Sequence, residues 1–107
     1  MFYIDDKNNI YLTKGDSGTL DITLMAGDVE YIMQEGDKLL FAVKADKNYN
    51  YALIEKESET NSIDFVETDT SEFSSIECDY SLSLVYANGN IDTFMTAKFI
   101  ILGACYD

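Results

Sequence analysis

The feature that most constrains the fold is a pair of alternating segments near the end of the chain. Residues 79–86 and 91–102 place mostly apolar side chains at every second position, and Asn88-Gly89 stands between them. A period of two is typical of half-buried strands, and Asn-Gly favours a tight hairpin turn in which both central residues have positive φ. The chain is therefore predicted to be an all-β protein with one long β-hairpin over residues 79–102.

The register of this hairpin assigns its side chains to two faces. With Asn88 and Gly89 as the two loop residues, the numbers of opposed positions sum to 177. Because side chains alternate across a strand, one face is predicted to close the core. That face carries Tyr80, Leu82, Leu84 and Tyr86 opposite Ile91, Thr93, Met95, Ala97, Phe99 and Ile101.

The second face carries apolar side chains where polar ones are expected, namely Val85, Phe94, Ile100 and Leu102. An apolar group on a solvent face can mark a protein–protein contact. These four residues are therefore the predicted interface. The alternative is that the N-terminal segment, residues 1–4, covers them.

The two cysteines are placed by the same register. Cys78 is expected opposite Phe99, whereas Cys105 is expected opposite position 72, six residues away. Six residues of a strand span about 20 Å, and a disulfide needs Cα atoms about 4.4–6.8 Å apart. Two free thiols are predicted, one semi-buried and one near the C-terminus.

Turn residues divide the rest of the chain into short alternating segments. The helix-start pattern of Asp69 with Glu72 three residues later predicts one short helical turn at most. Seven or eight short strands with regular turns predict an Ig-like antiparallel β-sandwich, formed by a single domain over residues 1–107. The other expected strands are residues 10–12, 19–25, 29–33, 38–44, 51–56 and 63–66.

Composition restricts the partners. Aspartate and glutamate number 20 against seven basic residues, all lysine, and the net charge is −13. Nucleic acids and anionic membranes both attract basic surfaces, so neither is an expected partner. A basic protein surface or a divalent cation suits this charge better. A hydrophobic content of 47% argues against disorder.

The chain also lacks the sequence signals of membrane insertion and secretion. No stretch approaches the roughly 18 apolar residues of a membrane-spanning helix. Residues 1–6 have no basic segment, apolar stretch and cleavage site of the secretory type. Synthesis in a cytoplasm is expected, with a virion or prophage particle as a further destination.

One short motif coincides with a catalytic one. Gly15-Asp16-Ser17-Gly18 matches the residues around the nucleophile of chymotrypsin-like proteases, but the chain contains no histidine to accept the hydroxyl proton. A turn is predicted there instead. Carboxylate pairs could still serve acid–base chemistry, yet 20 acidic residues single out no pair. No enzyme activity, catalytic residue, cofactor or metal ligand is predicted.

Residues 46–50, with Glu57 at the twelfth position, coincide with the ligand spacing of a calcium loop. Tyr51 stands where that loop needs glycine, so a polar inter-strand loop is favoured. Residues 5–9 have the same interpretation. A surface-type β-sandwich module that binds carbohydrate or calcium remains the alternative function.

Two segments together resemble a known family. Residues 12–24 resemble the opening strand motif of the N-terminal domain of BppU-type upper baseplate proteins of tailed phages. Residues 78–85, Asn88-Gly89 and residues 93–101 are similar to the final hairpin of that domain, and residues 39–44 to its middle strand. The resemblance spans residues 10–102.

The resemblance implies an Ig-like sandwich that joins a larger baseplate assembly by protein–protein contacts. In that family the domain usually begins a longer chain with receptor-binding parts, whereas this chain stops five residues after Leu102. The expectation is therefore a structural or adaptor protein of a phage or prophage tail. Its expected partners are other proteins of the assembly or further copies of itself.

Overall fold

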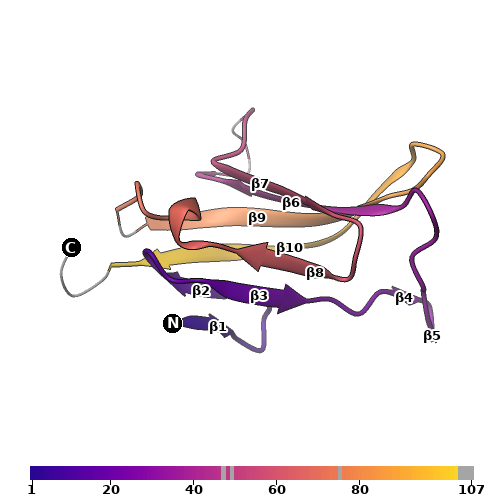
Figure 1. The fold of residues 1–107 in the computed structure, drawn as a ribbon, viewed down its shortest axis with the longest axis horizontal. Helices are drawn as coiled ribbons and strands as arrows, with labels where there is room; N and C mark the ends of the chain where they lie inside the picture. The colour runs from indigo at the N-terminus through magenta and orange to yellow at the C-terminus, as the bar shows by residue number, and fades with distance from the viewer. Residues whose placement is uncertain (47, 49, 75, 104–107) are drawn as a thin grey trace.

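The computed structural model describes residues 1–46, 48, 50–74 and 76–103, which form ten strands and one short 3-10 turn (Figure 1). Six strands make the main sheet, in the order β1-β2-β10-β9-β6-β7, and β3–β8 and β4–β5 make two further pairs. The all-β prediction is confirmed. The elements are β1 (Phe2–Ile4), β2 (Ile10–Thr13), β3 (Gly18–Asp21), β4 (Met25–Ala26), β5 (Val29–Glu30), β6 (Lys38–Lys44), β7 (Ile54–Ser58), β8 (Ser62–Phe65), η1 (Glu67–Asp69), β9 (Ile76–Val85) and β10 (Ile91–Leu102).

The main sheet is a curled half-barrel of mixed direction. Its neighbours are antiparallel except β2 and β10, which pair in parallel from Phe99 opposite Ile10 to Leu102 opposite Thr13. An entirely antiparallel arrangement was predicted. The parallel pair arises because β2 lies along the outer edge of β10 and not beside its sequence neighbour β3.

The β3–β8 ribbon packs on one face of the main sheet, which we call the inner face (Figure 1). Phe65 of β8 carries this contact, with its ring centroid 5.1 Å from that of Phe41 and 5.6 Å from that of Phe99. The three rings are completely or almost completely buried. Burial of aromatic rings supplies much of the hydrophobic stabilisation of a small core.

The β9–β10 hairpin is confirmed, but its loop differs from the predicted one. Gly89 has a φ of 92° and its N–H donates to the carbonyl of Tyr86 at 2.8 Å, while Tyr86 N–H donates to the carbonyl of Asn90 at 2.8 Å. The loop is therefore the three residues 87–89, with a single left-handed position. Asn-Gly suits this three-residue loop as well as the two-residue one.

A β-bulge at Phe94 compensates for the extra loop residue. Near the loop, Ile91 opposes Val85, so paired numbers sum to 176; from Met95 opposite Leu82 onward they sum to the predicted 177. Tyr80, Leu82, Leu84, Phe99 and Ile101 are buried as predicted. Ile91 and Thr93 were predicted to face the core but are exposed, because the register near the loop turns them to the outer face.

Cys78 lies opposite Phe99, as the register predicts, and its thiol is free. It is 1% exposed, so it is buried and not semi-buried, and desolvation raises its pKa. Cys105, the second predicted thiol, lies outside the described residues.

The helical turn lies before the predicted position. The 3-10 turn spans Glu67–Asp69, and the Asp69 carboxylate accepts a hydrogen bond from Val66 N–H at 2.8 Å. The same carboxylate pairs with Lys56 Nζ at 2.7 Å. Asp69 therefore closes a turn that begins before it, and does not start a helix that follows it.

The N-terminal segment does not cover the outer face, which corrects the alternative considered for the four predicted interface residues. β1 pairs edge to edge with β2, from Phe2 opposite Leu12 to Ile4 opposite Ile10. The Phe2 ring turns inward and lies 5.8 Å from that of Phe65, whereas Tyr3 packs on Tyr11 with ring centroids 5.8 Å apart. The segment extends the sheet in its own plane.

Candidate functional site

A short hairpin projects from the end of the molecule where β10 begins (Figure 1). We call residues 25–30 the arm; it consists of β4 and β5, which pair only with each other and turn at Gly27, whose φ is 67°. A strand was predicted over residues 19–25. The strand ends at Asp21, opposite Ser62, where its partner β8 begins, and the last backbone hydrogen bond between the two segments is the one of 2.8 Å from Ile22 N–H to the carbonyl of Asn61.

The arm is held to the body by Tyr31. Its N–H donates to the carbonyl of Leu24 at 2.8 Å and its hydroxyl donates to the Asp37 carboxylate at 2.5 Å. The Tyr31 ring meets that of Tyr86 edge-on, with centroids 6.0 Å apart. The Tyr31 side chain therefore joins the base of the arm to Tyr86, the residue that follows β9.

Asp37 is the centre of this attachment and is only 4% exposed. Its carboxylate also accepts hydrogen bonds from Gln34 N–H at 2.9 Å and Ala87 N–H at 3.0 Å. The hydrogen bond from Tyr31 and those from the backbone lower the pKa of Asp37, and the bond to Asp37 raises the pKa of Tyr31 to about 12. Asp37 thus fixes the arm, the 34–37 turn and the β9–β10 loop relative to one another.

Between the arm and the beginning of β10 lies a hollow of about 400 Å³. We call it the apolar hollow after its leucine, methionine and phenylalanine side chains, although polar groups of Thr23, Asp92 and two tyrosines also line it. Leu24 and Leu84 are buried, whereas Met25 is 57% exposed and Phe94 is 37% exposed. None of its lining residues is basic. They are Thr23, Leu24, Met25, Ala26, Tyr31, Leu84, Tyr86, Asp92 and Phe94.

The structure distributes the four predicted interface residues over separate places. The bulge brings Phe94 into the apolar hollow beside Leu84. Val85 is half-buried opposite Ile91, and Ile100 and Leu102 are half-buried at the far end of β10, against β2. Of the predicted set, only Phe94 contributes to the hollow.

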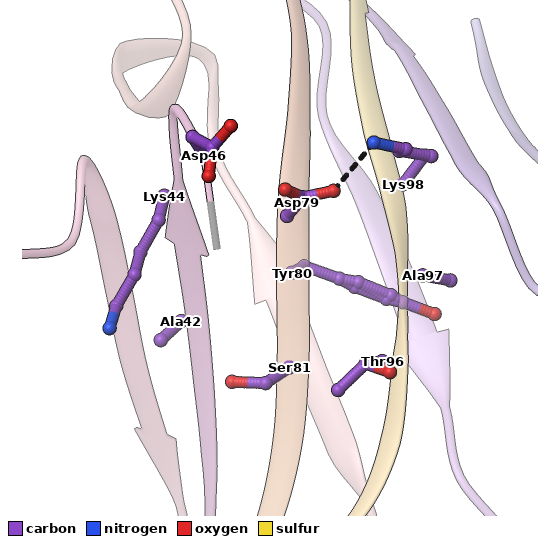
Figure 2. Close-up of a pocket in the computed structure, with 9 residues that line it drawn as sticks. All are labelled: Ala42, Lys44, Asp46, Asp79, Tyr80, Ser81, Thr96, Ala97 and Lys98. Atoms are coloured by element: carbon purple, nitrogen blue, oxygen red, sulfur yellow. Dashed lines mark ion pairs between the residues drawn. The ribbon is translucent and has the colours of Figure 1, made fainter. Parts of the chain in front are cut away.

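A second hollow of about 490 Å³ lies on the outer face of the sheet (Figure 2). Small side chains, among them Ala42, Ser81 and Thr96, line it, and Lys98 Nζ pairs with Asp79 at 2.8 Å. The hydrogen bond and charge of Asp79 raise the pKa of Lys98. Because its charges are matched within the sheet, we interpret this surface as a solvated sheet face.

Acidic side chains of the two loops considered for calcium have other partners in the structure. The Asp5 carboxylate accepts hydrogen bonds from Lys7 N–H, from both Asn9 donors and from the Tyr11 hydroxyl. Burial raises the pKa of Asp5, but these hydrogen bonds outweigh that effect and lower it. In the other loop, residues 47 and 49 lie outside the described part, and Glu57 lies on β7 with Lys38 Nζ 3.7 Å away.

The Gly15-Asp16-Ser17-Gly18 motif forms the predicted turn. Gly15 has a φ of 83°, and Asp16 N–H donates to the carbonyl of Thr13 at 2.9 Å. The Asp16 carboxylate binds the N-terminal ammonium group. In the described part of the chain, no group of three or more Cys, Asp or Glu side chains is placed to hold a metal ion.

The comparisons with known proteins give no relative. No family model matches the sequence, and neither the curated proteins nor the solved structures contain a match. Within residues 1–46, 48, 50–74 and 76–103, no helix has the length and apolar character needed to cross a membrane.

Sequence reasoning missed most of the apolar hollow. In the sequence, Glu35-Gly36-Asp37 has only the composition of a turn, and the arm is divided between the expected strands 19–25 and 29–33. A signal was present in the run 25–33, where Met25, Val29 and Ile32 do not follow the alternation of a paired strand. All three are more than half exposed in the structure.

Proposed function

We propose that this chain is a non-enzymatic structural or adaptor protein of a phage or prophage tail or baseplate, and that it acts through protein–protein contacts. The observation that carries the proposal is the apolar hollow, with Met25 and Phe94 exposed at 57% and 37% beside buried leucines. Exposed apolar surface gathered around a concavity is typical of protein interaction sites. The resemblance of residues 10–102 to the baseplate domain gives the proposal its biological setting.

The Ig-like sandwich belongs to the same proposal. Its support is the two-layer arrangement, in which the β3–β8 ribbon faces the main sheet through Phe65. The second layer would then be a reduced sheet, and the mixed main sheet with its parallel β2–β10 pair would be a departure from the antiparallel pattern.

The location and partners follow from this assignment. The protein would be made in a cytoplasm and built into a virion or prophage particle. Its partners would be proteins of that assembly, or a second copy of the chain, and not nucleic acid or membrane. The net charge of −13 supports the exclusion of both polyanionic partners.

A carbohydrate-binding module is the second candidate, and the aromatic lining of the hollow favours it. Tyr31, Tyr86 and Phe94 could stack on a sugar ring beside Asp92. However, the Tyr31 hydroxyl already donates to Asp37, and Met25 and Leu24 offer sugar hydroxyls no hydrogen bond. Glycan-array binding and calcium calorimetry are both expected to give no signal.

The test begins with the genes beside the encoding gene, which are expected to encode tail proteins. Each neighbouring structural protein would be co-expressed with this chain and complexes measured by analytical ultracentrifugation. Phe94→Glu is expected to abolish the complex, because it places a charge in the apolar hollow. Tyr51→Glu is the matched control, since Tyr51 is 71% exposed and follows the C-terminal end of β6, whereas the arm precedes the N-terminal end of that strand. Neighbouring genes unrelated to tails, with no complex formed, would contradict the proposal.

A further inference from the structure

The partner's chemistry can be inferred from the charges around the apolar hollow. Asp92 lines the hollow itself, and the arm adds the exposed side chains of Asp28 and Glu30. Glu35 lies exposed in the turn between Tyr31 and Asp37, which hold the arm. One carboxylate, that of Asp92, therefore lies on the β10 side of the hollow, and Glu30 lies on the arm side, paired with Met25, with no lysine among the lining residues.

A second copy of this chain is a poor occupant. Copies of a chain with a net charge of −13 repel one another. In a symmetric contact the same patch meets itself, so Asp92 and the arm carboxylates would approach their own equivalents. Juxtaposed like charges at an interface oppose association.

A complementary occupant needs two properties. Met25 and Phe94, exposed at 57% and 37% above the buried Leu24 and Leu84, offer an apolar contact for a large apolar side chain. The surrounding carboxylates favour cationic groups on either side of that anchor. Resting on the proposed function, we infer that the apolar hollow receives a segment of another protein in which large apolar side chains are flanked by lysine or arginine.

The attachment of the arm supports a preformed site. The Asp37 carboxylate accepts one hydrogen bond of 2.5 Å from the Tyr31 hydroxyl, at the base of the arm, and is itself held by the backbone N–H groups of Gln34 and Ala87. A wall held in this way loses little conformational entropy when the segment binds. The main conformational entropy cost of binding is therefore the ordering of the partner segment.

The experiment uses two pools of synthetic nine-residue peptides that share a random central pair of large apolar residues. In one pool lysines flank the pair, and in the other glutamates do. Binding of each fluorescent pool to the full chain would be measured by anisotropy at low and high salt. The lysine pool is expected to bind, at least tenfold more tightly than the glutamate pool, and to weaken as salt screens the carboxylates.

Variants then locate the effect. Asp28→Asn/Glu30→Gln/Asp92→Asn is expected to weaken the lysine pool about tenfold. The control Glu55→Gln/Glu57→Gln/Glu59→Gln removes the same charge around β7, at the far edge of the sheet, and is expected to change binding less than twofold. Phe94→Glu is expected to abolish binding of the lysine pool.

Two outcomes would overturn the inference: equal binding of the two pools, or no binding of the lysine pool. Self-association that Phe94→Glu abolishes would also overturn it and assign the hollow to a second copy. A further outcome is a complex with a neighbouring tail protein that Phe94→Glu abolishes but that neither salt nor the charge variants weaken. That outcome would support the proposed function and contradict the inferred partner chemistry.

Discussion

The two ends of strand β10 have opposite environments although they belong to one strand. At its C-terminal end, Phe99 and Ile101 are completely buried between β2, β9 and the aromatic rings under the β3–β8 ribbon. At its N-terminal end, Ile91 is 64% exposed and Phe94 is 37% exposed. The β3–β8 ribbon covers only the C-terminal end of β10. The position at which β3 ends therefore decides where the core stops and the apolar hollow begins.

The largest difference in stability between the two ends is expected for substitutions of Phe65. Phe65→Ala is expected to lower the free energy of unfolding by about 3–5 kcal/mol, because the ring is 2% exposed and packs against Phe41 and Phe99. Phe94→Ala at the other end is expected to cost less than about 1 kcal/mol. Urea unfolding followed by circular dichroism measures both. Equal losses would show that the two ends are packed alike.

Two tyrosines also distinguish the two ends, since the pKa of the half-buried Tyr31 and that of the buried Tyr80 are each raised to about 12 for different reasons. The hydrogen bond to Asp37 raises that of Tyr31, whereas burial raises that of Tyr80. Asp37→Asn is therefore expected to lower the pKa of Tyr31 toward the ordinary value of about 10 and to leave Tyr80 unchanged. Spectrophotometric titration, with Tyr31→Phe and Tyr80→Phe to assign the phenols, is the measurement.

The shifted pKa values of Tyr31 and Asp37 make the stability of the protein depend on pH. A phenol whose pKa is raised on folding stabilises the protein below its unfolded value of about 10, and that contribution is lost as pH rises through about 12. The melting temperature of the wild type should therefore fall more steeply over this window than that of Tyr31→Phe. Asp37, whose pKa is lowered, contributes above about pH 4 and loses its contribution as pH falls further. Parallel pH profiles of wild type and Tyr31→Phe would contradict the attachment role of Tyr31.

The sequence predicted the elements whose signals are local and repeated. Residues 38–44, a continuous apolar run between two lysines, form β6 with the predicted bounds, and the hairpin around Asn88-Gly89 was also correct. The parallel contact of β2 with β10 could not be foreseen, because it joins residues about 90 positions apart with no turn to define it. The bulge at Phe94 follows from the number of loop residues, which Asn-Gly leaves open.

The candidate site was less predictable than the fold. Phe94 was identified as an unexpected apolar residue, but the structure does not place it beside Val85, Ile100 and Leu102, because a one-residue change of register moves a side chain to the opposite face. Asp37 carried the ordinary signature of a turn. Its role depends on Tyr31 and on Ala87, which lies 50 residues further along the chain. Contacts of that kind emerge only from the assembled fold.

Substitution of Gly18, at the core end, is expected to lower the free energy of unfolding less than Phe65→Ala does. A Cβ added at Gly18 of β3 would lie 2.5 Å from Cγ of Phe2, so Gly18→Ala must displace the Phe2 ring that packs on Phe65. The expected loss in the free energy of unfolding is about 2 kcal/mol. Phe2→Ala introduced with it is expected to recover part of that loss relative to the sum of the two single variants, in a double-mutant cycle followed by urea unfolding. Strict additivity would show that the two residues are not in conflict.

The smallest effect is expected at the glycine of the arm. Gly27 has a φ of 67° but nothing within 4 Å of an added Cβ, so Gly27→Ala adds backbone strain without crowding. The strain is about 1 kcal/mol, and opening of the arm, which pairs with no other strand, relieves it. Hydrogen exchange should therefore accelerate for the arm amides and stay constant in β9, with the melting temperature nearly unchanged. Gly27→Asn, which tolerates positive φ better, should show less acceleration. Faster exchange in β9 as well would mean that arm and core unfold as one unit.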